Sequence, residues 1–498
     1  MYYTVRLPPM ATAPIMSLIK YPRKRNFDSY ALFCDFCQKK GHTIRGCLAL
    51  PTVPDEDERQ DYFDCLINSP RLEQSRFDGL TLKQAACLFL KSGTKLNTNN
   101  PVKSATDKRN VLRSNIGFWK ALGAGKSVIS WHAYGLPCRH EIPPQRIRFK
   151  NHKSYYDNIN FCDKEVKKHV NDGSFSIVDK TFPEMILPQQ VEFNSAKKAR
   201  RVDDERWLNS YLAYMIFTME SLGNSIPQVV RPKDKLISAD LEKAYYKVWM
   251  QRSWRKYMCF EHKGDFISSN VLLFGMGPAP FWFTKISRPM LGFFRTLLIN
   301  VTNYVDDWLF SERIEKVHEL VEFVMTIFSS LGWVVNDKSV LKPSDHLIYL
   351  GLIVDAENFM FKAPQHKIDR VKAVITRLTL KSRAGEPIEL ADLRSVSGYC
   401  VSLSLALPPI MLWVRLMNEL APLNFGKHDT HTSLDPESIR LLEQLPILLD
   451  TRNGHPIVQQ PIQPDFSFHL DAGEMGCGVH EAGNIILTEA LHAFEHHW

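Results

Sequence analysis

Tyr304-Val-Asp306-Asp307-Trp-Leu-Phe310 places two adjacent carboxylates between two runs of apolar residues. This pattern predicts two strands joined by a tight turn, with both acids at the turn. A further acid, Asp240, ends the short apolar segment Ile237-Ser-Ala-Asp240. If the two segments pair in one sheet, three carboxylates come together at the ends of neighbouring strands.

Three such carboxylates suit a magnesium site. Mg²⁺ prefers oxygen ligands and commonly takes one or two carboxylates together with substrate phosphates. A two-metal site holds its ions about 3.5–4 Å apart, where one activates an attacking hydroxyl and the other stabilises the leaving oxygen of a phosphoryl transfer. An isolated Asp-Asp pair is more often an ordinary turn, so the assignment depends on the surrounding sequence.

The surrounding motifs follow one another in a characteristic order. They are 197–209 (KKARRVDDERWLN), 240–245 (DLEKAY), 273–284 (LFGMGPAPFWFT), 304–307 (YVDD), 331–339 (LGWVVNDKS) and 349–351 (YLG). The series resembles that of reverse transcriptases, over roughly residues 110–480. It is most similar to DIRS-type tyrosine-recombinase retrotransposons in the Trp119 region, in Phe274-Gly275 with Ala279-Pro280, and in Leu405-Ala-Leu-Pro-Pro409.

The resemblance implies an α+β right-hand polymerase with fingers, palm and thumb, acting as an RNA-directed DNA polymerase. Asp240, Asp306 and Asp307 would be its catalytic carboxylates and would bind two Mg²⁺ ions. Lys338 resembles the lysine that protonates or neutralises the departing pyrophosphate, although an ordinary surface lysine fits that position equally well. The implied partners are an RNA template, a DNA primer or RNA–DNA duplex, and dNTPs.

Four further residues match the part of the family pattern that holds the incoming nucleotide. Arg200 resembles the fingers arginine that grips the triphosphate, a task suited to a planar bidentate cation. Its companion lysine is either Lys197 or Lys198, because the loop is shortened. Tyr245 resembles the aromatic gate whose bulk excludes a 2′-hydroxyl, with an ordinary core tyrosine as the alternative.

Phe274 and Gly275 resemble the loop that packs on nucleotide and template, where glycine allows close backbone approach. Two positions depart from the family pattern. Leu273 replaces the usual proline, and Glu242-Lys243 replaces a commoner basic-acidic pair. Neither change removes a predicted metal ligand.

A second metal site is predicted near the N-terminus. Cys34, Cys37, His42 and Cys47 have C-x2-C-x4-H-x4-C spacing, which suits one tetrahedral Zn²⁺. The segment resembles the CCHC zinc knuckle of retroviral nucleocapsid proteins. Its intervening basic and aromatic residues are typical of contacts to unpaired nucleic acid.

The sequence divides into five expected segments. They are a basic region with the knuckle (1–60), a linker or poorly defined segment (61–110), fingers and palm (111–362), thumb and connection (363–460), and a truncated ribonuclease-H-like fragment (461–498). Asp471 resembles the first metal ligand of ribonuclease H, but the segment is too short for the remaining ligands, so we expect no ribonuclease H activity. A degenerate aspartic-protease motif is the alternative for Asp471.

Composition is compatible with these expectations. The 498 residues carry a formal net charge of +8, which suits a polyanionic partner without requiring one. We expect an intracellular protein, cytoplasmic or nuclear, without a membrane anchor, and the oligomeric state stays open. The alternative function is a non-catalytic, zinc-dependent nucleic-acid-binding protein derived from a decayed or co-opted retroelement.

Overall fold

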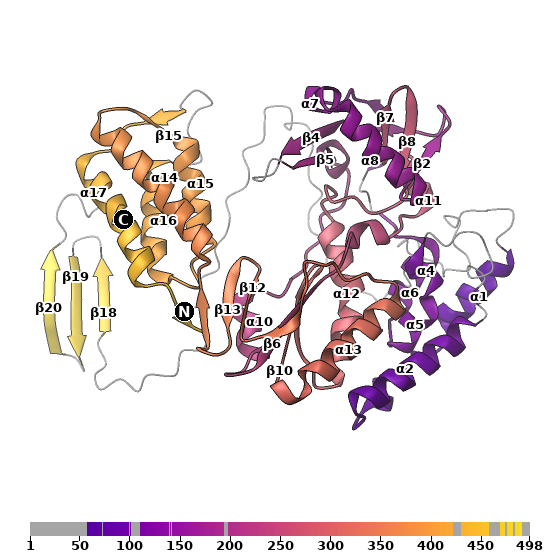
Figure 1. The fold of residues 1–498 in the computed structure, drawn as a ribbon. Helices are drawn as coiled ribbons and strands as arrows, with labels where there is room; N and C mark the ends of the chain where they lie inside the picture. The colour runs from indigo at the N-terminus through magenta and orange to yellow at the C-terminus, as the bar shows by residue number, and fades with distance from the viewer. Residues whose placement is uncertain are drawn as a thin grey trace.

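The computed structural model describes residues 57–71, 73–98, 100, 110–138, 140, 142–193, 198–421, 430–457, 469–473, 476–481 and 484–490. Figure 1 shows a sheet that contains β6 and β10 between a C-terminal helical bundle on one side and the N-terminal helices on the other. In the described ranges, none of the helices combines the length and apolar character needed to cross a membrane.

The central sheet has four antiparallel strands in the order β11-β6-β10-β9. Strand β6 (Lys235–Asp240) lies beside β10 (Asp307–Glu312), which forms a hairpin with β9 (Asn300–Tyr304). Strand β11 (Val340–Ser344) completes the other edge. The two strands and the turn that the sequence predicts around the aspartates are therefore confirmed.

The central sheet separates two hydrophobic cores, because side chains alternate between the faces of a strand. Ile237 and Phe310 belong to the larger core, which extends from Phe63 to Trp333. Leu236 and Leu309 belong to the second core on the opposite face. Both faces of this sheet are consequently buried.

Two long helices cover the first face of the central sheet. Helix α12 (Ala279–Thr296) lies against β9, and α13 (Ile314–Leu331) lies against β10. The fully buried ring of Phe294 contacts Trp308 and Phe310 edge-on, at 5.9 and 5.3 Å between centroids. Each such buried ring contributes about 1.5–3 kcal/mol of transfer free energy.

Beyond the central sheet lies a five-stranded sheet in the order β1-β3-β7-β8-β2, beside a β4–β5 hairpin. Helix α8 (Ile159–Asn171) packs on β2 of this sheet. The strands are β1 (Ile147–Arg148), β2 (Phe175–Val178), β3 (Met185–Ile186), β4 (Gln189–Phe193), β5 (Ala199–Asp203), β7 (Cys259–His262) and β8 (Asp265–Ser269). Short helices connect them: α7 (Lys153–Asp157), α9 (Arg206–Asn209), α10 (Leu222–Val229), η3 (Ala244–Lys247) and α11 (Arg252–Arg255).

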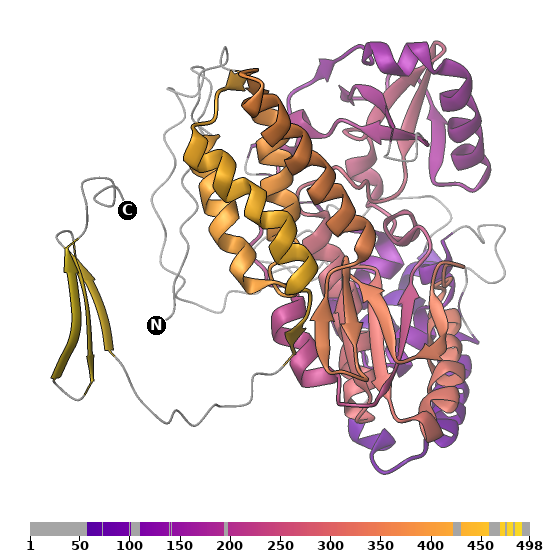
Figure 2. The ribbon, with the colours of Figure 1, turned by 60° about the vertical axis from the view of Figure 1, so that its left-hand side comes forward.

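The second core joins a small sheet to the C-terminal helices, which Figure 2 shows as a bundle. The region that contains Pro408-Pro409 is also helical. The strands are β12 (His346–Tyr349), β13 (Leu352–Asp355), β14 (Met360–Lys362) and β17 (His455–Pro456), with the separate pair β15 (Ile388–Glu389) and β16 (His431–Thr432). The helices are α14 (Gln365–Arg383), α15 (Leu390–Val401), η4 (Pro408–Ile410), α16 (Met411–Leu420) and α17 (Pro436–Thr451).

The prediction of a linker at 61–110 is wrong for most of that segment. Phe63 and Phe89 lie in helices and are fully buried in the larger core, and Phe89 lies 5.7 Å from Phe293 of α12. The helical segment that begins at Val111 is interrupted at Asn115. The elements are α1 (Asp57–Asn68), η2 (Gln74–Phe77), α2 (Leu82–Asn97), α4 (Val111–Ser114), α5 (Ile116–Ala121) and α6 (Lys126–Tyr134).

Helices α2 and α5 approach each other closely at two glycines. A Cβ at Gly93 would lie 2.1 Å from the Phe118 ring, and one at Gly117 would lie 2.6 Å from the Asn97 backbone nitrogen. The Asn97 side chain also accepts a hydrogen bond from the Gly117 backbone N–H at 3.2 Å. Glycine and asparagine residues therefore fix this helix pair. Contacts of this kind give no apolar periodicity in the sequence, so the pattern does not reveal them.

The last described strands form a separate three-stranded sheet of β18 (His469–Gly473), β19 (Gly476–Glu481) and β20 (Asn484–Ala490). The backbone pairing of Asp471 with Gly478 places this aspartate within β18 instead of at its end. The predicted zinc ligands Cys34, Cys37, His42 and Cys47 lie outside the described residues.

Gly117→Ala is expected to lower the free energy of unfolding by about 1–3 kcal/mol, because the new methyl group meets backbone that cannot rotate away. Gly398→Ala, also within a helix but with open space around its Cβ, should raise it by about 0.5–1 kcal/mol. Urea titrations of both variants measure these changes. Equal effects of the two substitutions would contradict the close helix approach.

Candidate active site

The register of the central sheet brings the three aspartates together. Asp307 is the direct partner of Asp240 across β10 and β6, and the Leu241 backbone N–H donates to the Asp306 carbonyl at 3.2 Å. Tyr304 pairs with Asp307, so Val305 and Asp306 form the two-residue turn. All three acids thus lie at one end of the sheet.

This turn has an unfavourable backbone conformation. Val305 has φ of 57°, in a region that a β-branched residue rarely adopts. The Asn303 side chain donates to the Val305 carbonyl at 3.2 Å and holds the turn in place. Backbone strain of this kind costs about 1–3 kcal/mol and persists only where surrounding structure enforces it.

Burial and mutual repulsion make the aspartates reluctant to ionise. Burial raises the pKa of Asp307 to about 6, with the negative charges of Asp306 and Asp240 adding to the effect. Burial likewise raises the pKa of Asp306, and Asp240 contributes. Burial raises the pKa of Asp240, while the Lys338 ammonium partly offsets this. A cation at this site would relieve the repulsion.

Lys338 lies in a small cavity with Asp240 and Asp307, of about 190 Å³. The neighbouring Ser339 hydroxyl accepts a hydrogen bond from the Asp240 backbone N–H at 2.9 Å. Tyr349, at the end of β12, donates to the Asp307 carbonyl at 3.1 Å. The structure therefore brings the sequence-predicted lysine to the aspartates from an adjacent strand connection.

Tyr245 lies deep beside the aspartates and between two other rings. Its centroid is 4.6 Å from that of Phe274 and 5.2 Å from that of Phe283, and only 5% of the residue is exposed. Burial, with the charge of Asp306 as the next contribution, raises its pKa above the usual range. Phe274, in contrast, is 61% exposed and so presents its ring to solvent.

The Phe274-Gly275 loop is held by close contact with Glu205 and by hydrogen bonds to Asn209. A Cβ at Gly275 would lie 2.8 Å from the Glu205 side chain. The Asn209 amide donates to the Gly275 carbonyl at 2.8 Å and accepts from the Gly277 N–H at 2.8 Å. Glycine at position 275 is therefore required by contact with the polypeptide itself.

A second cavity of about 660 Å³ lies between Phe274-Gly275 and the β4–β5 hairpin. Lys198 and Arg200, both predicted nucleotide-binding residues, line it, whereas Lys197 lies outside the described residues. Lys168 and Lys243 also line it. The sequence did not indicate Lys168 or Lys243 as site residues. Helix α8 brings Lys168 to the cavity, and the positive φ of Lys243 brings that residue there.

The neighbouring arginines of β5 have different environments. Arg200 is exposed, while the side chain of Arg201 is only 3% exposed and pairs with Asp203 at 2.7 Å. The Arg201 guanidinium also lies over the rings of Phe175 and Phe260, at 4.9 and 5.0 Å. Arg201 therefore stabilises the hairpin, and Arg200 is available to a ligand.

No three His, Cys, Asp or Glu side chains converge into a ready metal site within the part of the chain that the structure describes. The three aspartates nevertheless supply the hard oxygen donors that Mg²⁺ prefers. Burial is the main cause of their raised pKa values, and a bound cation would offset the further contribution that neighbouring negative charges make at Asp306 and Asp307. The donor chemistry of this site thus fits magnesium.

Comparison with known proteins identifies the region that contains this site. Residues 192–354 match the family model described as reverse transcriptase (RNA-dependent DNA polymerase). The chain contains a reverse transcriptase domain. The match supports RNA-directed DNA polymerase activity, and it includes Arg200, Tyr245 and the three aspartates. No curated protein sequence matches the chain.

Solved structures of a foamy viral protease-reverse transcriptase have a similar fold. The one with dsDNA has a TM-score of 0.53 at 16% identity and covers 86% of this chain and 83% of its own. A dRH form with dsDNA has a TM-score of 0.52 at 14% identity, covering 87% and 72%. A complex with RNA/DNA hybrid has a TM-score of 0.51 at 16% identity, covering 86% and 54%. The similarity thus extends well beyond the matched reverse transcriptase domain.

Asp307→Asn is expected to stabilise the metal-free protein at neutral pH. In the native state the Asp307 carboxyl has a pKa of about 6, above the usual value of 3.8. Between pH 3.8 and pH 6 the native state therefore keeps a proton that the unfolded chain has released. The contribution of this carboxyl to the free energy of unfolding of the wild type is therefore fully present below about pH 4 and is lost as the pH rises through 6. For a half-buried group we expect a gain of about 1 kcal/mol at pH 7.5 and little at pH 4.

Thermal unfolding at both pH values measures this difference. Asp337→Asn, at an exposed position next to Lys338 in the sequence, removes one negative charge and serves as the control. An equal gain from the two variants, or a gain for Asp307→Asn that does not change with pH, would contradict the raised pKa of Asp307.

Proposed function

We propose that this chain is the RNA-directed DNA polymerase of a retrotransposon, of the DIRS type. The supporting observation is the position of Asp240, Asp306 and Asp307 at one end of the central sheet, within a reverse transcriptase domain, where burial and, for Asp307, neighbouring negative charge raise the pKa. The proposed reaction joins a dNTP to the 3′-hydroxyl of a primer that is paired with an RNA template.

In this proposal Asp240 and Asp306 hold two Mg²⁺ ions with help from Asp307. Bound magnesium would activate the attacking hydroxyl and stabilise the leaving oxygen. Lys338 lies in the cavity of Asp240 and Asp307 and would donate a proton to, or neutralise, the departing pyrophosphate. The chain's own contribution is to hold these groups on a rigid, doubly buried sheet.

The cavity beside Phe274 is the proposed nucleotide site. Lys198 and Arg200 would contact the triphosphate, and the ring of Phe274 would face the base. Tyr245 lies between this cavity and the aspartates, where the sugar of a bound nucleotide would pass. Its ring is held by Phe274 and Phe283, so it cannot move aside for a 2′-hydroxyl.

The N-terminal segment adds a proposed zinc knuckle. Cys34, Cys37, His42 and Cys47 would bind one Zn²⁺, and the folded knuckle would hold unpaired nucleic acid for the polymerase. Metal binding would supply most of the folding free energy of so short a segment. The proposal predicts one equivalent of zinc per chain, lost on substitution of any of the four ligands.

Asp306→Asn is expected to reduce primer extension on an RNA template by at least about 100-fold, because one of the charged ligands is lost. Magnesium should raise the unfolding temperature of the wild type, and raise it much less in Asp306→Asn, which provides a readout independent of activity. Asp337→Asn should behave as wild type in both measurements. Equal extension by wild type and Asp306→Asn would exclude the catalytic assignment.

The same experiment separates the alternative function. A wild-type chain that extends no primer, yet binds RNA in a zinc-dependent manner that survives Asp306→Asn, would be a nucleic-acid-binding protein without polymerase activity. The intact set of three aspartates favours the polymerase.

Tyr245→Val is expected to increase the use of ribonucleotides relative to deoxyribonucleotides by about 10-fold or more, because the smaller side chain leaves room for the 2′-hydroxyl. Competition between rNTPs and dNTPs in primer extension measures this ratio. Tyr257→Phe, at a buried tyrosine that lines neither the nucleotide cavity nor the cavity of Asp240, is the control and should leave the ratio unchanged. A loss of extension with an unchanged ratio would mean that Tyr245 is an ordinary core residue.

A further inference from the structure

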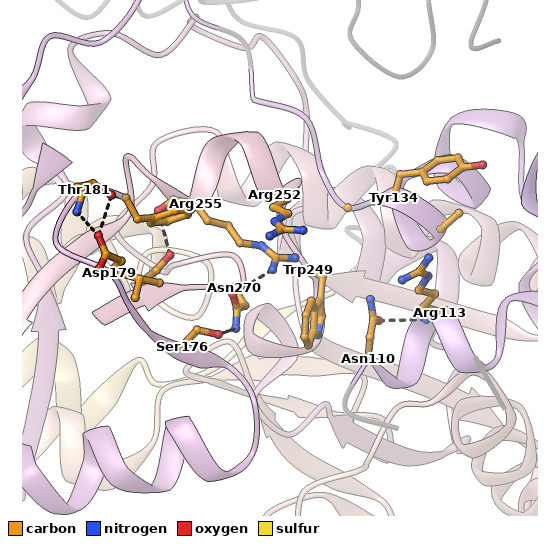
Figure 3. Close-up of a pocket in the computed structure, with 15 residues that line it drawn as sticks. Asn110, Arg113, Tyr134, Ser176, Asp179, Thr181, Trp249, Arg252, Arg255 and Asn270 are labelled. Atoms are coloured by element: carbon orange, nitrogen blue, oxygen red, sulfur yellow. Dashed lines mark hydrogen bonds between the residues drawn. The ribbon is translucent and has the colours of Figure 1, made fainter. Parts of the chain in front are cut away.

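A cavity of about 600 Å³ lies between the N-terminal helices and the five-stranded sheet (Figure 3). Its volume is in the range of sites that hold a small organic ligand. It shares none of its lining residues with the nucleotide cavity. The reactions proposed above therefore leave this cavity without a role.

The new cavity and the nucleotide cavity lie on opposite faces of the five-stranded sheet. Ser176 of β2 and Ser268 of β8 are register partners, and both line the new cavity. Phe175, the preceding residue, points to the other face, where its ring lies 5.0 Å from that of His169 on α8. His169 lines the nucleotide cavity. A ligand of the new cavity would consequently occupy a separate site.

Positive charge predominates among the residues that line the new cavity. They include the arginines 113, 252 and 255, against a single acid, Asp179. Asp179 accepts hydrogen bonds from the backbone N–H and hydroxyl of Thr181, at 2.9 and 2.7 Å, which lower its pKa. With three guanidinium groups around one cavity, an anion gains attraction from all of them.

Arg255 is held in a defined orientation at this site. Its Nε donates to the Met250 carbonyl at 3.0 Å, and one terminal nitrogen donates to the Asn270 side chain at 3.0 Å. The guanidinium lies over the ring of Trp249, at 5.0 Å from its centroid. Figure 3 shows Arg252, Arg255 and Trp249 together in the middle of the cavity. A fixed guanidinium plane beside an aromatic ring offers both phosphate contacts and a stacking surface.

We propose that this cavity binds one nucleotide of a single-stranded nucleic acid, outside the polymerase site. Its phosphate would contact Arg252 and Arg255, and its base would pack against Trp249 and the guanidinium plane of Arg255. Flat stacking surfaces together with arginines favour a nucleotide over an acidic peptide, which has charge but no planar group at each residue. The site goes beyond the proposed polymerase reaction and does not depend on it.

The test is binding of a labelled oligonucleotide of about twelve nucleotides, as DNA and as RNA, to the full chain, followed by fluorescence anisotropy at low and moderate salt. Arg252→Glu is the informative variant, because Arg252 is exposed and its replacement should not disturb folding. Lys316→Glu on the exposed surface of α13 makes the same charge change at a residue that does not line the cavity, and is the control. A blunt-ended duplex tests whether the effect is specific for single strands.

We expect Arg252→Glu to weaken single-strand binding by about fivefold or more and to reduce the salt dependence by about one phosphate contact. Lys316→Glu and blunt-duplex binding should change less than about twofold. A photoreactive thymidine in the oligonucleotide should cross-link to the segment from Val248 to Arg252.

Three results would overturn the site. The first is equal weakening by the two charge reversals, and the second is equal weakening of single-strand and duplex binding by Arg252→Glu. The third is displacement of the oligonucleotide from the cavity by a poly-glutamate peptide at equal charge, which would indicate an acidic protein as ligand. All these measurements report binding, so they remain interpretable if the wild type extends no primer.

Discussion

The antiparallel pairing of β6 with β10 forces like charges together, and the rest of the site depends on it. The register that opposes Asp240 to Asp307 also opposes Ile237 to Phe310, two apolar residues of the larger core. A shift by one residue would turn every apolar side chain of β10 to the other face. Burial of these apolar residues therefore holds the aspartates together at a partly buried position, where burial first and their mutual repulsion second raise the pKa of Asp307 to about 6.

The buried rings behind the sheet supply the stability that this repulsion and the strained turn consume. Phe294 packs against Trp308, Phe310 and Phe328 in a cluster that belongs to α12, β10 and α13. Such a cluster allows little movement, because protein interiors are packed as densely as organic crystals. The aspartates are therefore presented from a rigid base, while Phe274 in a loop and Arg200 in strand β5 remain exposed.

Two chain segments connect Tyr245 with the arginine-lined cavity. The Met250 N–H donates to the Asn270 carbonyl at 2.9 Å, and the Leu272 N–H donates to the Val248 carbonyl at 2.9 Å. Tyr245 lies just before the first segment and Phe274 just after the second. The five-stranded sheet thus has one face toward the nucleotide cavity and one toward the new cavity, with a short, hydrogen-bonded ladder between them.

The sequence by itself determined the features that are local. The hairpin at Tyr304, the strand before Asp240 and the helices after Gln365 follow from apolar periodicity and turn residues, and the order of the motifs identified the aspartates. Only the tertiary structure decided which of Arg200 and Arg201 is exposed, because the segment Ala199–Asp203 has no apolar alternation that marks its inner face. It also decided that Lys243 lines the cavity beside Phe274 and that Phe63 and Phe89 belong to the larger core. These features depend on contacts between residues far apart in the chain, such as Gly117 with Asn97 and Phe89 with Phe293, which leave no periodic pattern in the sequence.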